Sequence, residues 1–161
     1  MLIKDPVCGM EVTPHHIEVV YRGIGYSFCS TQCRDRFQAN PGLYVGQPGQ
    51  IAPKQAGLQV IKRRRLRLEH ELSDSQAGIM IAELRAMMGI KSVVIEGNMV
   101  EIVYDLLEVT EEQVEEKIAG IGLQLGEAWM DHLRRAFIHY EEECEVGNLE
   151  VHEWHSLSNL H

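Results

Sequence analysis

The sequence predicts an α+β fold: a small cysteine-containing module, then a βαββαβ unit and an extra C-terminal helix. Three of the four cysteines lie within the first 33 residues. A segment rich in Gly, Pro and Gln follows them. Beyond it, apolar residues switch between the two-residue period of strands and the three-to-four spacing of helices. We therefore predict modules at 1–46 and 58–126, a linker at 47–57, and a helix with a polar tail at 127–161.

The charge is uneven along the chain. Its 15 basic and 24 acidic residues give a net charge of -9. Residues 1–57 carry 5 basic and 4 acidic residues, or +1, and residues 58–161 carry 10 and 20, or -10. This balance argues against a nucleic-acid binder. We interpret the basic run at 62–65, with Arg67, as a solvated strand face or as a segment in contact with the acidic residues that follow. An alternative interpretation of that run is a phosphate-binding patch.

The absence of long apolar runs bears on location. No run approaches the roughly 20 residues that span a bilayer. The first six residues lack the layout of a signal peptide. We therefore expect a cytoplasmic protein without membrane insertion, in a compartment where thiols stay reduced.

Turn residues and short apolar runs predict the elements of the first module. Residues 16–21 and 26–28 read as strands of a hairpin around a glycine-rich turn. Ser30 is a suitable cap for the helix that follows. Cys29 then precedes the helix and Cys33 lies in its first turn, so their spacing of four brings the two sulfurs to one side.

A module of about 45 residues can barely bury a self-sufficient core, and it needs a staple, a metal or a partner. In a reducing compartment, a thiolate-bound metal is a better staple than a disulfide. Three cysteine sulfurs suit Cu(I) or Zn(II), and a closed zinc site would want a fourth ligand. Nearby candidates for that ligand are Met10, His15 and His16. Without one, Cu(I) or an open, exchangeable site is favoured; the alternative is free cysteines that act as small apolar side chains.

A dense pattern surrounds these cysteines. It reads Asp5-Pro6-Val7-Cys8-Gly9-Met10, then Tyr21-x-Gly23-x-x-Tyr26-x-Phe28-Cys29-Ser30-x-x-Cys33-x-x-x-Phe37-x-x-x-Pro41-x-x-Tyr44. The pattern, over residues 4–45, resembles the YHS domain, a relative of the TRASH domains. Such modules occur alone and at the N-termini of copper- and other heavy-metal-transporting ATPases. The resemblance implies a metal-binding module with Cys8, Cys29 and Cys33 as ligands. It also implies a small aromatic core beneath the site, formed by Tyr21, Tyr26, Phe28, Phe37 and Tyr44.

Strand and helix signals alternate from residue 58 onwards. Ser73, three residues before Gln76, predicts a capping box, and Thr110 predicts a second helix cap. The predicted elements are a strand within 58–72, a helix from 73 to Gly89, strands at 90–96 and 99–105, a helix at 111–119 and a final strand at 120–125. This order is the ferredoxin-like arrangement.

The second module resembles the heavy-metal-associated domain of copper chaperones and metal-transporting ATPases. The order of elements and the phrase Gly89-Ile90-Lys91-Ser92-Val93 carry that resemblance. The family places Met-x-Cys-x-x-Cys between its first strand and first helix, whereas the loop at 71–77 has no cysteine here. We therefore predict a docking or dimerisation platform. We interpret the loop itself as a simple helix cap. The alternative is a site for a different metal, formed by the harder ligands His70, Glu71 and Asp74.

The last helix, predicted over 127–144, has two contrasting faces. Trp129, Leu133, Ala136, Phe137, Tyr140 and Cys144 form an apolar stripe that we expect to pack on the sheet or on a second subunit. On the polar side, His132 and His139 are seven residues apart and Glu143 follows four later. These three form a candidate second metal site. The alternative is a solvated, charged helix face.

Together these features predict a cytosolic protein that binds a soft metal, as a chaperone, buffer or sensor, with Cu(I) favoured and Zn(II) second. It would pass the metal by thiolate exchange to a metal-transporting ATPase or another metal-handling protein. A homodimer is a candidate assembly. The alternative is a metal-stapled scaffold or oligomerisation protein without a trafficking role. We expect no enzyme, because the sequence lacks a nucleophile–base pair, a phosphate-binding loop and a cofactor motif.

Overall fold

The computed structural model describes residues 1–123, 125–126 and 129–158. The chain divides into two compact units: Met1–Gln59 together with the chain from Cys144 onward, and Val60–Glu143. Helices and small sheets occur together, which confirms the predicted α+β class. Among the described residues, no helix has the length and apolar character needed to cross a membrane.

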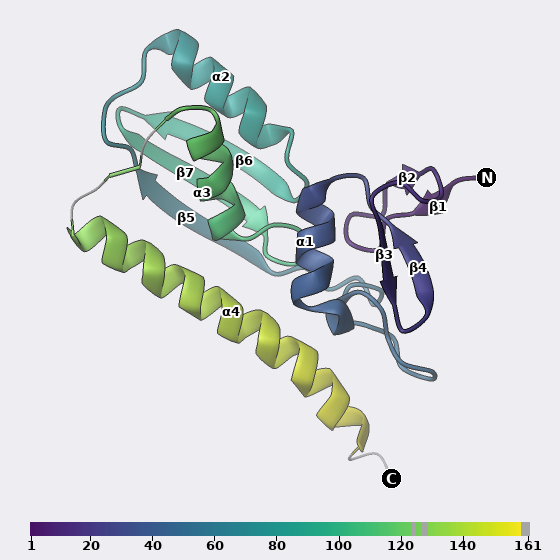
Figure 1. Cartoon of the computed structure of the whole chain (residues 1–161). Helices are drawn as coiled ribbons and strands as arrows, with labels where there is room; N and C mark the ends of the chain where they lie inside the picture. Colours follow the sequence, from purple (N-terminus) through teal and green to yellow (C-terminus); the bar gives the residue numbers. More distant parts are fainter. Residues whose placement is uncertain (124, 127–128, 159–161) are drawn as a thin grey trace. The chain divides into compact units, whose positions relative to one another are not determined.

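The first unit carries two short antiparallel strand pairs and a helix (Figure 1). Its elements are β1 (Ile3–Lys4), β2 (Glu11–Val12), β3 (Glu18–Tyr21), β4 (Ile24–Ser27), α1 (Thr31–Ala39) and the 3-10 turn η1 (Pro41–Leu43). In the hairpin, Tyr21 pairs with Ile24, so the turn is formed by Arg22 and Gly23. Both have positive φ, 52° and 79°, as a two-residue type I′ turn requires.

Aromatic rings form the core of this unit, as the YHS resemblance implied. The ring of Phe37, on α1, lies 5.2–6.2 Å from four other rings, centroid to centroid. Those rings belong to Tyr21, Tyr26, Phe28 and Tyr44. Phe28, Phe37 and Tyr44 are almost fully buried. The segment 47–57, predicted as a linker, contains no helix or strand, but its Ala52 and Pro53 are buried.

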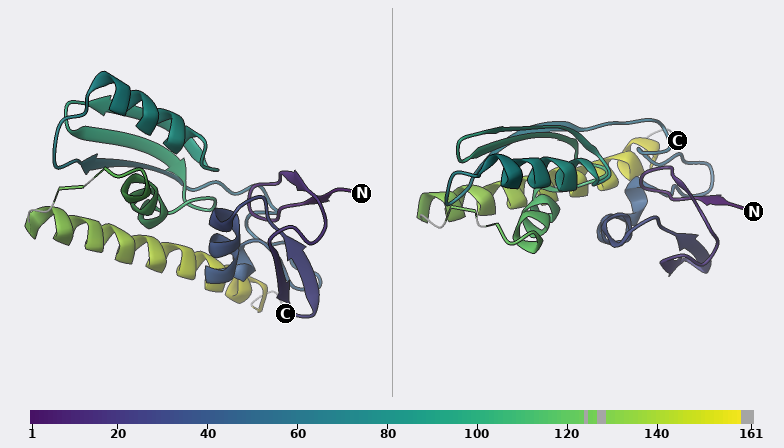
Figure 2. Two further views of the ribbon diagram at one scale, coloured as in Figure 1. Left: turned by 45° about the horizontal axis from the view of Figure 1, so that its top comes forward. Right: turned by 90° about the horizontal axis from the view of Figure 1, so that it is seen from above.

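The second unit is built on a three-stranded antiparallel sheet in the order β5-β7-β6. The strands are β5 (Ile61–Arg67), β6 (Ile90–Glu96) and β7 (Met99–Asp105). Helices α2 (Asp74–Arg85) and α3 (Glu111–Gly120) lie on the same face of this sheet (Figures 1 and 2). Both predicted caps are confirmed, since the side chains of Ser73 and Thr110 each accept a bond from the third residue of the helix.

The described residues of the predicted final strand at 120–125 form no continuous strand. Helix α3 runs to Gly120, and Gly122 adopts φ 91° in the turn that follows. Among the described residues, the strand pairing here is one antiparallel bridge between Leu68 and Leu125, and Gln124 lies outside the described residues. The four-stranded ferredoxin-like arrangement therefore stays a prediction.

Helix α4 (Trp129–Ser158) is longer than the predicted helix at 127–144. The expected packing of its apolar stripe on the sheet is wrong, because Leu133, Phe137 and Tyr140 are 50%, 61% and 65% exposed. Ala136 and Cys144 are exposed as well, and the side chain of Trp129 lies outside the described residues.

The buried side of α4 in the second unit contains Ile138 and the acidic Glu142. Glu142 can be buried because its carboxylate accepts hydrogen bonds from the Tyr104 hydroxyl and, at 2.9 Å, from the Glu111 backbone N–H. Because Glu142 has buried hydrogen-bond donors, it occupies a buried position on α4. The pattern of apolar residues along the helix would place a glutamate at that position in solvent.

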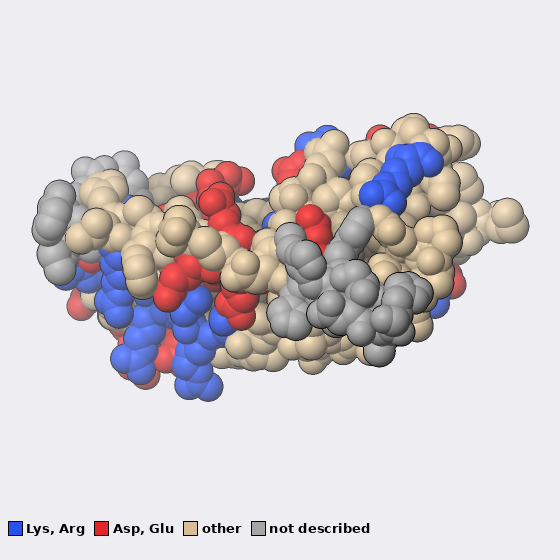
Figure 3. All heavy atoms as spheres, turned by 90° about the horizontal axis from the view of Figure 1, so that it is seen from below, with Lys and Arg blue, Asp and Glu red and all other residues tan. Residues whose placement is uncertain are grey.

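The basic run lies on β5, where acidic side chains pair with it. Arg65 Nε lies 3.0 Å from Glu101, and the Arg67 guanidinium binds Asp131. Arg64 Nε lies 3.6 Å from the buried Glu142. In Figure 3, Lys and Arg side chains gather on part of the surface with acidic side chains among them. The run is therefore a strand with partly neutralised arginines.

Candidate metal centre

The first cysteine lies in a tight loop between β1 and β2. The Asp5 N–H donates to the Met10 carbonyl at 2.8 Å, and the Gly9 N–H donates to the Asp5 carbonyl at 2.9 Å. Gly9 has φ 78°, a conformation that glycine adopts without strain. These bonds fold residues 5–10 back on themselves and hold Cys8 within the loop.

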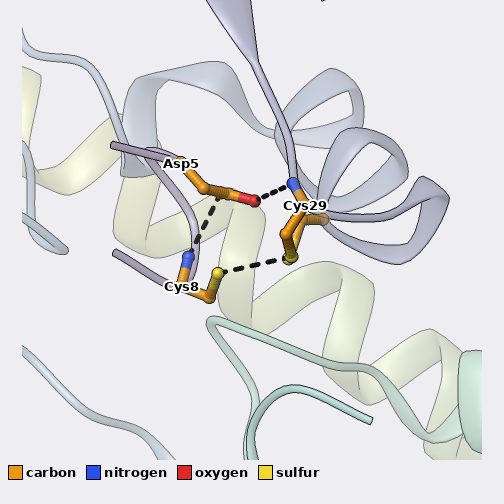
Figure 4. Close-up of side chains that lie close together, drawn as sticks. Asp5, Cys8 and Cys29 are labelled. Carbon is orange, nitrogen blue, oxygen red and sulfur yellow. Dashed lines mark hydrogen bonds between the residues drawn. The ribbon is translucent and has the colours of Figure 1, made fainter. Parts of the chain in front are cut away.

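The buried carboxylate of Asp5 joins this loop to the second cysteine segment (Figure 4). Its Oδ1 accepts bonds from the backbone N–H groups of Val7 at 2.7 Å and Cys8 at 3.3 Å. Its Oδ2 accepts the backbone N–H of Cys29 at 2.8 Å. Hydrogen bonds to a charged acceptor are among the stronger ones in proteins. Asp5 therefore fixes the position of Cys8 relative to Cys29.

Helix α1 positions the other two cysteines. Ser30 caps the helix, and its hydroxyl accepts the Cys33 N–H at 3.4 Å. Cys29 immediately precedes the cap, so Cys29 and Cys33 point to one side, as their spacing predicts. The Cys8 and Cys29 sulfurs are 3.5 Å apart, and those of Cys29 and Cys33 are 3.6 Å apart.

These separations are too long for a disulfide, whose sulfurs lie about 2.05 Å apart. They are close to the roughly 3.8 Å expected between two sulfurs that each lie about 2.3 Å from a shared tetrahedral metal. Ligand atoms of Asp5, Cys8, Cys29 and Cys33 all lie within 4.8 Å of one another. Cys33 is buried, whereas Cys8 and Cys29 are half-buried, so one side of the cluster faces solvent.

The three thiols differ in how readily they ionise. A hydrogen bond with the Cys33 thiol lowers the pKa of Cys8, and the same contact raises the pKa of Cys33. Burial raises the pKa of Cys29 to about 11. The negative charge of Asp5 also disfavours the Cys8 and Cys33 thiolates. A bound cation would supply the positive charge that this cluster of sulfurs and carboxylate lacks.

The three fourth-ligand candidates lie outside the cluster. Met10 is 45% exposed, and His16 is exposed as well. His15 directs Nδ1 to Glu18 at 2.5 Å. In the part of the chain that the structure describes, the fourth group beside the sulfurs is Asp5. The sequence pattern includes Asp5 but did not indicate its role, because that role depends on backbone donors 2, 3 and 24 residues away.

The structure does not gather the second predicted set. His132 is exposed, with Nδ1 3.3 Å from the Arg135 guanidinium, and Glu143 is exposed. His139 instead turns to Glu111 and Glu115 of α3, and these three form a second cluster. Cys144 is an exposed free thiol outside both clusters.

A comparison with protein-family models bears on the first unit. Residues 3–48 match the YHS domain family. The matched region contains the whole cysteine cluster and agrees with the predicted range of 4–45. The match and the cluster together indicate a metal-binding domain. No curated protein and no solved structure matches the chain. The resemblance of the second module to heavy-metal-associated domains stays a prediction.

Proposed function

We propose that this protein binds a soft transition-metal ion through Cys8, Cys29 and Cys33 and transfers it by thiolate exchange. The observation that carries the proposal is that three sulfurs lie together inside the region that matches the YHS domain. The Cys29 sulfur is 3.5 Å from that of Cys8 and 3.6 Å from that of Cys33. Sulfur ligands select Cu(I) and Zn(II) over magnesium or calcium.

The surroundings of the sulfurs favour Cu(I) over Zn(II). A structural zinc site is normally closed by four protein ligands. Here the fourth group is Asp5, and both of its oxygens already accept backbone N–H bonds. A site with three sulfurs suits three-coordinate Cu(I). The half-buried Cys8 and Cys29 leave a side from which a partner's thiolate can enter and take the metal.

For the second unit we propose a role in partner recognition. The strand order β5-β7-β6, with Leu125 bridged to Leu68 just beyond β5, is compatible with a ferredoxin-like sheet. The loop before α2 has no cysteine, so a metal-binding loop of the heavy-metal-associated kind is missing. We propose a cytoplasmic, non-catalytic protein whose partner is a metal-transporting ATPase or another metal-handling protein.

An anaerobic Cu(I) titration against a competing chelator tests the metal site. We expect one Cu(I) per chain, bound in the wild type and lost when Cys8, Cys29 and Cys33 are all changed to Ser. Cys144→Ser is the matched control, because this exposed cysteine lies outside the cluster, and it should bind like the wild type. Stoichiometric Cu(I) binding by the triple variant would overturn the proposal.

Transfer needs a separate experiment. The Cu(I)-loaded full chain is mixed with a metal-free acceptor domain that carries Cys-x-x-Cys, the two are separated, and copper is measured in each. We expect copper to move within seconds to minutes, faster than it dissociates into a chelator of equal affinity. Equal rates for acceptor and chelator would exclude direct ligand exchange.

The second candidate function is a metal-stapled scaffold that oligomerises. It is favoured by Leu133, Phe137 and Tyr140, which are exposed on α4 with a four-then-three spacing typical of helix association. Chelation separates the two candidates, because a structural site should unfold when stripped, whereas a transfer site should empty with the fold intact. Light scattering measures the molar mass of the wild type and of Phe137→Glu. If the protein is a scaffold, the wild type should be an oligomer and the variant should be a monomer.

A further inference from the structure

A second group of ligand atoms gathers in the other unit, away from any cysteine. His139, on α4, directs Nε2 to the carboxylates of Glu111 and Glu115 on α3. The distance from Nε2 to Glu111 Oε2 is 2.8 Å, and Nε2 is hydrogen-bonded to Glu115 Oε2. The three ligand atoms lie within 4.8 Å of one another. Glu111 and Glu115 are four residues apart, so they share one face of α3.

The carboxylate of Glu111 has an ion-pair contact with His139 but no aligned hydrogen-bond donor among the described residues. Its side chain is 0% exposed, and neither of its oxygens has a hydrogen-bond partner among the described residues. His139 Nε2 makes its hydrogen bond with Glu115, whereas Glu111 Oε2 has the 2.8 Å ion-pair contact with the same nitrogen. A buried, unsatisfied polar group in a native protein calls for an explanation, and an absent ion is a standard one.

Other side chains hold the two glutamates in place, one through the Glu111 backbone and the other through the Glu115 carboxylate. Glu142 accepts the Glu111 backbone N–H at 2.9 Å, and the Tyr104 hydroxyl donates to the other oxygen of Glu142. Arg135 Nε lies 3.0 Å from Glu115 Oε1, which leaves Oε2 facing the cluster. The Arg135 contact is of the outer-shell kind that orients a carboxylate ligand in metal sites.

An open hollow gives access to the cluster. Glu115, Arg135 and His139 line it together with His132. The sequence pattern grouped His132 with His139, and the structure brings both to this hollow although His132 is not part of the cluster. A cation can therefore reach Glu115 and His139 from solvent, while Glu111 closes the inner side.

We propose that Glu111, Glu115 and His139 form a second metal site, for a borderline divalent cation of the first transition row such as Zn(II). Two carboxylate oxygens and one imidazole nitrogen are ligands that Zn(II) accepts, and they suit Cu(I) poorly. The cation would bind the Glu111 carboxylate, which has no hydrogen-bond donor among the described residues. The chain would thus hold a soft ion and a harder ion in different units.

Zn(II) binding to the full chain tests the proposal in a background that carries Cys8→Ser, Cys29→Ser and Cys33→Ser. We expect one Zn(II) per chain by calorimetry, with a rise in melting temperature. Adding Glu111→Gln and Glu115→Gln should abolish both. The matched control adds Glu69→Gln and Glu96→Gln, which are exposed in the same unit, lie outside the cluster and the hollow, and remove the same charge. The control should bind Zn(II) as the background does.

Equal Zn(II) binding by the glutamine pair and its control would overturn the proposal, as would no binding in the background. If the serine background does not fold by circular dichroism, Co(II) spectra of the wild type replace it. The second site should then add bands without sulfur-to-cobalt charge transfer, and His139→Gln should remove them. Their persistence in His139→Gln would also overturn the proposal. Cu(I) binding by the cysteines is measured separately, so either site can fail alone.

Discussion

The two units present clusters of opposite chemistry, built in different ways. In the first unit, three sulfurs come from a loop and a helix start only 25 residues apart, between Cys8 and Cys33. In the second unit, two carboxylates and an imidazole come from the helices α3 and α4. The sulfur cluster is therefore visible in the sequence as a spacing, whereas the carboxylate cluster exists only once the helices pack.

The cores beneath the two clusters also differ. The first unit relies on aromatic rings around Phe37, because its strands are only two to four residues long. The second unit relies on three strands of seven residues, with Val100, Ile102 and Tyr104 of the central strand fully buried. A small core has fewer contacts to lose, so the first unit should tolerate damage less well.

Phe37→Ala should therefore give the largest effect. It removes a buried ring that contacts four others, and such truncations cost about 3–5 kcal/mol. Amide hydrogen exchange should accelerate throughout β3, β4 and α1, and Cu(I) affinity should fall with the loss of the fold. Ile24→Ala, at a 58% exposed position of the same hairpin, is the control and should change stability by about 0.5 kcal/mol or less.

Ile102→Ala is the corresponding truncation of a buried side chain in the second unit. Truncation of a fully buried isoleucine costs about 2–5 kcal/mol. Exchange should accelerate in β5, β6 and β7, while Cu(I) affinity stays at the wild-type value. Val94→Ala on the neighbouring strand, where the side chain is 47% exposed, is the control. A fall in Cu(I) affinity with Ile102→Ala would show that the two units do not fold independently.

Local signals predicted most elements of both units. The sequence predicts strands 90–96 and 99–105 at their observed bounds because Gly97 and Asn98 interrupt two runs rich in apolar residues. Ser30, Ser73 and Thr110 marked the helix starts because each can accept a backbone N–H at the first turn. Such signals act within a few residues, so sequence alone reveals them.

Tertiary partners could not be predicted. The apolar stripe on α4 identified side chains that share a face, but Glu142 takes a buried position because of donors at Tyr104 and Glu111. His139 was a sound candidate ligand, yet its partners lie 24 and 28 residues earlier in the chain. Helix periodicity grouped it with neighbours on its own helix because it carries no information about the facing one.

Asp5→Asn should give an intermediate effect that is confined to the first unit. The amide retains one acceptor oxygen, so either the Cys29 N–H or the pair at Val7 and Cys8 loses its partner. An unsatisfied buried donor costs about 1–3 kcal/mol. Loss of an outer-shell group typically lowers metal affinity by about 10–100-fold.

Cu(I) titration and urea denaturation check this variant. Asp35→Asn is the control, because its exposed carboxylate pairs with Arg34 at the surface. If Asp5→Asn abolished binding in a chain of normal stability, Asp5 would be a ligand, and the three-sulfur description of the site would be wrong.

The smallest effect is expected from removing one helix cap in each unit. Ser30→Ala and Ser73→Ala each remove a hydroxyl that accepts a backbone N–H in the first turn, at 3.4 and 3.2 Å, and each should cost about 1 kcal/mol.

The donor to Ser30 is the Cys33 backbone, and the Ser30 hydroxyl also lies 3.7 Å from the Cys29 sulfur. Ser30→Ala should therefore weaken Cu(I) binding by up to about fivefold, which corresponds to ~1 kcal/mol. Ser73→Ala should leave Cu(I) binding unchanged, because its donor, Gln76, belongs to a helix without a metal ligand. Equal Cu(I) affinities for both variants would mean that the sulfurs hold their positions without the cap, through Asp5 alone.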